Sequence, residues 1–247
     1  MPQRTTEWFE NINFSYHEKQ FKETYRSTVH FCNWLEKSEV INRECKLTIF
    51  DFASGQGANI YYMSKRYPNC NFIGIEINPK LVLIGNTFFE KNNIKNCQLI
   101  EADMLNIDGI KYPKADVIIS FQTLSWMPEY EKPLQKMIDL QPTWIALTSL
   151  FYEGPISCKI QVQDYDDHLS PSIQSYYNIL SIPLIEDYFS KNKYHKFNYL
   201  AFDIDIDIPK NSNGSRGTYT KKLDTGKRIQ ISGPLLMPWY FILASKQ

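Results

Sequence analysis

Short apolar runs alternate with longer amphipathic stretches between about residues 46 and 149. The short runs are rich in Ile, Val and Phe, which favours buried strands, and the longer stretches repeat apolar residues every three or four positions, which favours helices. Strands that alternate with helices are typical of a parallel sheet with crossover helices. The pattern predicts strands over Leu47–Phe52, Asn71–Ile77, Gln98–Ala102, Ala115–Ser120 and Trp144–Ser149.

Prolines and apolar spacing mark the helices around these strands. Ala58–Tyr67 is predicted to be a helix that ends before Pro68, and Pro79 suits the first turn of the next helix. A further helix is expected over Lys132–Asp139, and one or two helices over Tyr16–Lys37. The N-terminal helices therefore add a cap to the α/β core.

The pattern changes after residue 150. Ile182–Phe189 predicts a helix, and Phe197–Ile208 alternates apolar and polar residues as a half-exposed strand does. Thr218–Lys222 and Arg228–Ser232 flank an Asp-Thr-Gly turn signal and predict a hairpin. Because Trp239–Ala244 predicts a last strand, this hairpin is expected as an insertion between the last two strands of the sheet.

Length and charge limit the classes of function. The 247 residues fit a single domain, with a helical cap (residues 1–45), a core (46–149) and covering segments with the last strands (150–247). Twenty-seven Lys and Arg balance 27 Asp and Glu, so the chain lacks the basic field of a protein that grips long nucleic acid. The expected partner is a small molecule and not nucleic acid, and the oligomeric state stays open.

Nothing in the sequence predicts secretion or a membrane span. The polar N-terminus lacks the apolar core of a signal peptide, and Pro238 interrupts the apolar run of residues 235–244. The five cysteines are widely spaced and predict neither a disulfide framework nor a metal site. We therefore expect a cytoplasmic protein without a membrane partner or a bound metal.

The segment that follows the first strand carries the clearest candidate chemistry. Gly55-Gln56-Gly57 forms a tight turn into a helix, where backbone amides and the helix dipole can approach a ligand. Glu76 lies at the end of the next strand, where a carboxylate can accept hydrogen bonds from both ribose hydroxyls. The two features together predict a nucleoside site.

At these positions the chain resembles the class I methyltransferases that use S-adenosyl-L-methionine. The first motif of that family matches Asp51 and the glycine turn, and its ribose carboxylate matches Glu76. The resemblance implies a Rossmann-like α/β fold with a seven-stranded sheet, S-adenosylmethionine as cofactor, an adenine contact at Asp103, and backbone carbonyls near Ser120 that hold the methionine ammonium. It assigns the cofactor to Asp51, Ala53, Ser54, Gly55, Gln56, Gly57, Glu76, Ile77, Asp103, Met104, Ser120, Phe121 and Gln122.

NAD is the alternative cofactor, because dehydrogenases use the same strand, helix, strand unit. The turn lacks the third glycine of the dinucleotide fingerprint, since Asn59 and Ile60 follow Ala58. The family also often has a glycine where this chain has Ala53, which predicts an altered turn with binding retained.

The acceptor is expected to lie under segments outside the core. No Asn/Asp-Pro-Pro-Tyr motif follows the fourth strand, which argues against methylation of a base amine, and no carboxylate cluster there predicts a metal-dependent catechol site. Aromatic residues and a basic cluster on the hairpin (Arg216, Lys221, Lys222, Lys227 and Arg228) predict an aromatic roof with an anion clamp. The substrate candidates are Tyr25, Arg26, Trp126, Tyr177, Arg216, Arg228 and Trp239.

Three residues are candidates for catalysis. His168 is the candidate general base, and Tyr152 and Tyr219 are candidates to orient an acceptor hydroxyl. The C-terminal pattern Gly217–Thr220, Gln230–Pro234 and Pro238–Tyr240 is similar to bacterial methyltransferases that tailor surface polysaccharides, including those associated with the phosphoramidate group of capsules. The sequence thus predicts an O-methyltransferase of a small anionic acceptor, with a small-molecule N-methyltransferase and a non-catalytic cofactor-binding partner module as alternatives.

Overall fold

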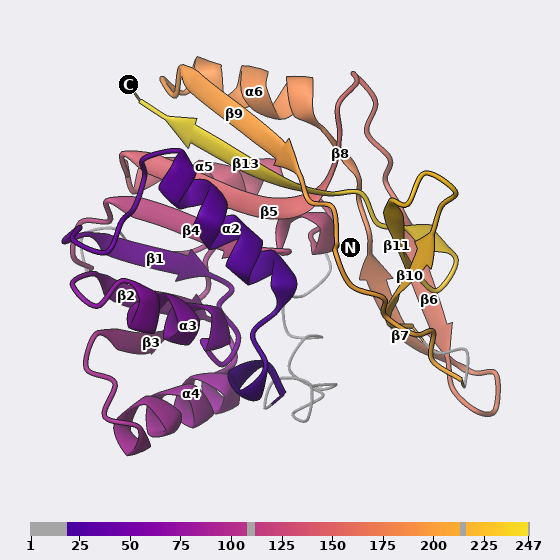
Figure 1. Ribbon diagram of the computed structural model, residues 1–247, viewed down its shortest axis with the longest axis horizontal. Helices are drawn as coiled ribbons and strands as arrows, with labels where there is room; N and C mark the ends of the chain where they lie inside the picture. Colours follow the sequence, from indigo (N-terminus) through magenta and orange to yellow (C-terminus); the bar gives the residue numbers. More distant parts are fainter. Residues whose placement is uncertain (1–18, 108–111, 213–215, 247) are drawn as a thin grey trace.

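A computed structural model describes residues 19–107, 112–212 and 216–246. Its centre is an eight-stranded sheet in the order β3-β2-β1-β4-β5-β13-β9, with β8 paired to the end of β5 (Figure 1). The first five strands of this order run parallel, and β13 is antiparallel to both of its neighbours. The strands span β1 Thr48–Phe52, β2 Asn71–Glu76, β3 Cys97–Glu101, β4 Val117–Phe121, β5 Trp144–Tyr152, β8 Leu180–Ser181, β9 Lys196–Ala201 and β13 Trp239–Ser245.

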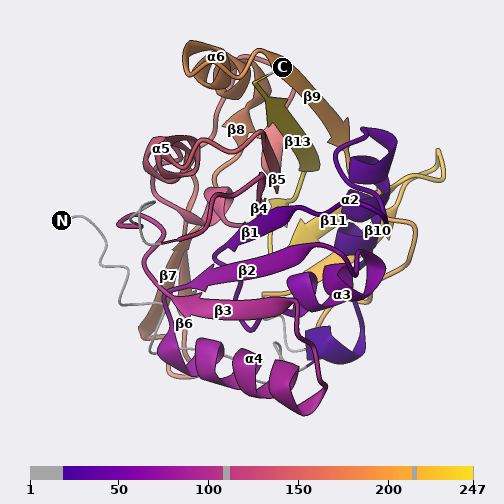
Figure 2. The ribbon, with the colours of Figure 1, turned by 90° about the vertical axis from the view of Figure 1, so that its left-hand side faces the viewer.

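Helices cover both faces of the sheet (Figure 2). Apolar side chains of α2 and α3 belong to one buried cluster, and those of α5 and α6 belong to a second cluster on the opposite face. None of the described helices is long and apolar enough to cross a membrane. The helices span α2 Arg26–Lys37, α3 Ala58–Arg66, α4 Pro79–Lys91, η3 Leu124–Trp126, α5 Glu131–Asp139 and α6 Ile182–Lys191.

Two small sheets lie beyond the carboxyl ends of the parallel strands (Figure 1). One is the hairpin of β6 Gln161–Tyr165 and β7 Pro171–Tyr176. The other joins β10 Thr218–Lys222, β11 Arg228–Ser232 and β12 Leu235–Leu236, and it is inserted between β9 and β13. The Rossmann-like fold, the five parallel strands predicted between residues 47 and 149 and the inserted hairpin are therefore confirmed.

The strand predicted over Phe197–Ile208 is too long. β9 ends at Ala201, and in the segment that follows Phe202 and Ile204 are buried whereas Ile206 is exposed. Three aspartates alternate with these apolar residues, and each forms an ion pair with a basic side chain elsewhere in the chain. Asp203 pairs with Lys227, Asp205 with Arg26 and Asp207 with Arg228. We call residues 202–208 the acidic strap.

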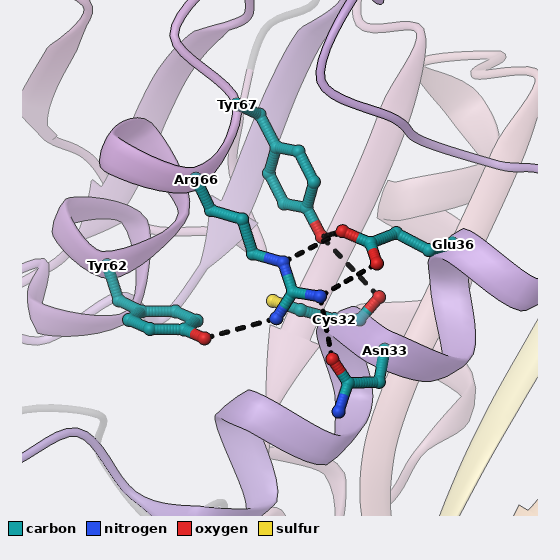
Figure 3. A network of polar contacts seen from close by, with 6 residues as sticks. All are labelled: Cys32, Asn33, Glu36, Tyr62, Arg66 and Tyr67. Atoms are coloured by element: carbon teal, nitrogen blue, oxygen red, sulfur yellow. Dashed lines mark hydrogen bonds and ion pairs between the residues drawn. The ribbon is translucent and has the colours of Figure 1, made fainter.

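The N-terminal cap is fixed to the core through an arginine network between α2 and α3 (Figure 3). Arg66 donates to both carboxylate oxygens of Glu36, at 2.8 and 2.7 Å, and the Tyr67 hydroxyl donates to the same carboxylate at 3.0 Å. Burial raises the pKa of the Cys32 thiol in this network to about 12, so the thiol stays protonated. The predicted helix over Tyr16–Lys37 corresponds to α2 and a short helical turn before it, and residues 16–18 lie outside the described part.

Candidate functional site

The glycine turn between β1 and α3 forms the floor of the candidate site. Gly55 and Gly57 have φ angles of +57° and +80°, which glycine adopts without steric cost. Helix α3 begins after Gly57 with no side chain capping its N-terminus. Its first amides therefore stay available to a ligand.

Ala53 has φ +58°, a left-handed conformation that costs a residue with a Cβ atom roughly 1 kcal/mol. Ala53→Gly should therefore stabilise the protein by up to about 0.5 kcal/mol, after the glycine entropy loss of roughly 0.5–1 kcal/mol is subtracted. Urea unfolding measures the change. Ala201→Gly, at an exposed position of β9, is the control and should destabilise; a loss of stability in Ala53→Gly would contradict the strain argument.

Glu76 closes the end of β2 beside the turn. Its Oε2 accepts from the Gly55 amide at 2.8 Å, and its Oε1 accepts from the Asn78 amide at 2.9 Å. Burial raises the pKa of Glu76, and the backbone amides that donate to it act in the opposite direction. Each oxygen keeps a lone pair, so the carboxylate can also accept from a ribose.

Buried polar atoms without a partner gather at this edge of the sheet. Both carboxylate oxygens of Asp51 lack a hydrogen bond, although the residue is almost fully buried on β1. Buried polar groups are normally satisfied, so such a cluster points to a missing ligand. Within the described residues the buried side chains with an unpartnered N or O atom are Asp51, Ser54, Gln56, Asn78 and Thr148.

Burial, with the nearby charge of Glu76, raises the pKa of Asp51 well above its ordinary value. The unfolded chain releases this proton at about pH 4. Since the folded state holds the proton to higher pH, this group's contribution to stability is lost as pH rises toward the folded pKa. Asp51→Asn should therefore be increasingly more stable than the parent protein as pH rises above about 4. Urea unfolding across pH tests this, and two parallel stability curves would contradict it.

The residues to which the family resemblance assigns the adenine and the methionine ammonium also lie at the carboxyl edge of the sheet. Asp103 follows β3, where its oxygens accept from the Leu105 amide at 2.9 Å and the Asn106 side chain at 2.7 Å.

The end of β4 is fixed to its neighbouring strands. The Ser120 hydroxyl donates to the Phe52 carbonyl at 3.0 Å and so joins β4 to β1. Gln122 is left-handed, with φ +62°, and its amide donates to the Thr148 carbonyl. Ile77 and Met104 are half-buried beside these groups in the chain, and Phe121 packs on Phe31.

Only some of the predicted roof residues come together. Trp126 in η3 packs on Tyr177, with ring centroids 4.1 Å apart, and Arg216 donates to the Tyr177 hydroxyl at 3.1 Å. Tyr25 and Arg26 begin α2, which the Thr28 hydroxyl joins to Asn59 just after the glycine turn. Trp239 is a core residue and not a roof residue, because β13 pairs it with Leu150 inside the sheet.

The predicted anion clamp is not a set of free cations. Arg228 forms two hydrogen bonds with Asp207, at 2.7 and 3.2 Å, and Arg216 pairs with Asp164. Lys227 lies 3.7 Å from Asp203. The clamp prediction is therefore corrected for Arg228: the acidic strap pairs with Lys227 and Arg228, and an anion that binds Arg228 would have to displace the Asp207 carboxylate.

The catalytic candidates lie on separate elements. His168 occupies the exposed turn between β6 and β7, where its amide donates to the Asp166 carboxylate at 2.9 Å. Tyr152 ends β5 and is exposed, and Tyr219 lies on β10 with the Lys210 ammonium 5.5 Å from its ring centroid. Among the described contacts none joins two of these three side chains. In the described part of the chain the three side chains therefore do not form one hydrogen-bonded group.

Sequence reasoning missed Asn78 and Thr148. Asn78 precedes Pro79, a helix-start signal that identifies it as the cap of α4; its Oδ1 accepts from the Lys80 amide at 2.9 Å while its Nδ2 is unpartnered. Thr148 lies inside β5 next to Phe121 of β4, and no local signal distinguishes it from other strand residues.

Comparisons with known proteins agree with this geometry. Residues 44–151 match the family model described as a methyltransferase domain. Over 128 residues the chain is 27% identical to (S)-tetrahydroprotoberberine N-methyltransferase of Eschscholzia californica, which covers 50% of this chain and 35% of that protein. It is also 27% identical over 104 residues to the uncharacterized protein RP028 of Rickettsia prowazekii, which covers 41% of each chain. The chain thus spans well under half the length of these curated relatives.

Solved structures show the same fold at low identity. The YcgJ protein of Bacillus subtilis aligns with a TM-score of 0.57 and 12% identity over 88% of this chain and 98% of that chain. The N-terminal domain of EvdMO1, solved with S-adenosylhomocysteine bound, aligns with a TM-score of 0.57 and 10% identity over 89% of this chain and 81% of that chain. Residues 44–151, less than half of the chain, therefore match a methyltransferase domain, and the chain shares the fold of these solved structures.

Proposed function

We propose that the protein is an S-adenosylmethionine-dependent O-methyltransferase of a small, anionic acceptor. The observation that carries the proposal is the group of buried, unpartnered polar atoms beside the glycine turn. S-adenosylmethionine supplies an electrophilic methyl group on a sulfonium. It fits this site, since its ammonium and two ribose hydroxyls are hydrogen-bond donors, the buried Asp51 carboxylate has no partner, and each Glu76 oxygen keeps a lone pair.

Different residues of the chain would bind different parts of this cofactor. Glu76 would accept from the ribose, and the amides that begin α3 would line the floor of the site. Asp103 would bind the adenine, and the carbonyls near Phe121 would accept from the methionine ammonium. The enzyme then has to orient the acceptor oxygen in line with the methyl group.

An anionic oxygen as acceptor is supported by the position of the one candidate base, His168, in the exposed turn between β6 and β7. An oxyanion already carries the charge needed for attack and requires orientation only, whereas a neutral hydroxyl benefits from a positioned base. His168, Tyr152 and Tyr219 share no described contact. The resemblance of the C-terminal pattern to surface-polysaccharide enzymes supports a role in bacterial capsule biosynthesis, in the cytoplasm, where the free thiols of the five cysteines would persist.

An N-methyltransferase is the second candidate, because the relative from Eschscholzia californica is named for N-methylation. Purified protein with methyl-labelled S-adenosylmethionine and a panel of small phosphates, carboxylates and amines tests both. Product mass spectrometry should locate the label on oxygen. Label on nitrogen would favour the second candidate, and cofactor binding without turnover of any acceptor would favour a non-catalytic partner module.

A further inference from the structure

Arg216 occupies a niche between the two small sheets. Its Nη1 donates to the Ser175 hydroxyl at 2.7 Å and to the Tyr177 hydroxyl at 3.1 Å, and its Nη2 pairs with the Asp164 carboxylate. The guanidinium carbon lies 5.5 Å from the Tyr177 ring centroid. Two hydroxyls and one carboxylate therefore surround the Arg216 guanidinium.

This niche differs from the other arginine pairs of the covering segments. The two arginines are similarly buried, with Arg216 24% and Arg228 20% exposed, but Asp164 is 27% exposed whereas Asp207, the partner of Arg228, is 72% exposed. The hydroxyl groups beside Arg216 belong to buried residues, Ser175 and Tyr177. Partial burial strengthens a charge-assisted interaction with an anion, because water screens it less.

The niche is joined to the segment that follows β4. Tyr177 packs against Trp126, and the Asn178 amide donates to the Ser125 carbonyl at 2.8 Å. The Asn178 side chain also donates to the Met127 carbonyl at 2.8 Å. These contacts connect the niche to the segment that follows β4, the strand that ends at the proposed cofactor site.

The hydrogen-bond chemistry of the niche suits an oxyanion. The Ser175 and Tyr177 hydroxyls both accept from Arg216, so each keeps its own hydrogen to donate. We propose that Arg216, Ser175 and Tyr177 form a binding subsite for a carboxylate or phosphate group of the acceptor. The Asp164 carboxylate fills this subsite until the acceptor displaces it. The proposal rests on the proposed function. Of the residues of the predicted anion clamp, it gives an anion-binding role to Arg216 alone.

Inorganic phosphate, followed by phosphorus NMR line broadening at constant ionic strength, is the probe. Asp164→Asn should bind phosphate at least tenfold more tightly than the parent protein, since the internal competitor has lost its charge. Adding Arg216→Met to that variant should abolish the gain. Asp207→Asn is the matched control: it also frees an arginine, but one without the two hydroxyls, so its affinity for phosphate should match the parent.

Two results would overturn the subsite: equal phosphate affinity in Asp164→Asn and the parent, or an equal gain in Asp207→Asn. If Asp164→Asn does not fold, Ser175→Ala and Tyr177→Phe in the parent background carry the test, and unchanged affinity in both would overturn it. Titration with S-adenosylhomocysteine separates the two proposals. If the parent protein binds S-adenosylhomocysteine but Asp164→Asn shows no gain in phosphate affinity, only the subsite is rejected. If the parent protein does not bind S-adenosylhomocysteine, the proposed function is rejected.

Discussion

Glu76→Ala should weaken the binding of S-adenosylhomocysteine by about 100-fold or more. The variant loses the acceptor of two ribose hydrogen bonds, and hydrogen bonds to a charged group contribute roughly 1.5–3 kcal/mol each. It also loses the contacts that hold the turn, from the Gly55 amide at 2.8 Å and the Asn78 amide at 2.9 Å. Isothermal titration calorimetry measures the change.

Glu101→Ala is the matched control for Glu76→Ala. Glu101 ends the neighbouring strand β3 in register with Glu76, but it is exposed. Glu101→Ala removes one carboxylate from the same region, as Glu76→Ala does, but it leaves the proposed acceptor of the ribose hydrogen bonds in place. Affinity should stay within about twofold of the parent, far below the change expected from lost charged hydrogen bonds. Equal losses in the two variants would show a general charge effect and contradict a specific role for Glu76.

Gly85→Ala should destabilise the protein by roughly 2–3 kcal/mol, as overpacking does in a filled core. A Cβ at this position of α4 would lie 2.4 Å from the Gln56 carbonyl oxygen and 2.3 Å from a Leu99 methyl carbon. Helix propensity alone predicts the opposite sign, since alanine is favoured over glycine by about 1 kcal/mol. Because the clash pushes on the glycine turn, cofactor affinity should also fall by about tenfold, equivalent to 1.4 kcal/mol.

Urea unfolding and calorimetry with S-adenosylhomocysteine measure both effects of Gly85→Ala. Leu83→Ala, on the exposed side of the same helix at 68% exposure, serves as the control and should change neither quantity appreciably. A gain of stability in Gly85→Ala would mean that α4 does not pack against the turn as closely as the structure has it.

Most of the sheet was predictable because its signals are local. Each parallel strand is a short apolar run bounded by a turn or a proline, and β1 to β5 follow one another along the chain. The end of β9 was not predictable, since alternating apolar and acidic residues look the same in a strand and in the acidic strap. The difference lies in Arg26, Lys227 and Arg228, which come from distant parts of the sequence.

The same distinction applies to the site. The glycine turn and Glu76 belong to one strand, helix, strand unit, so their relative placement follows from the sequence. The roof depends on pairings between segments far apart, such as Arg216 with Asp164 or Trp239 inside β13. Composition reveals the aromatic and basic residues. It does not reveal which of them are buried in the core or paired with a carboxylate of the acidic strap.

A crystal structure of the protein with S-adenosylhomocysteine tests the central claim most directly. The account predicts the ribose hydroxyls within hydrogen-bond distance of Glu76 and the ligand above the turn of Gly55 and Gly57. An adenosyl group bound elsewhere, or the crevice filled by a dinucleotide in its place, would contradict it.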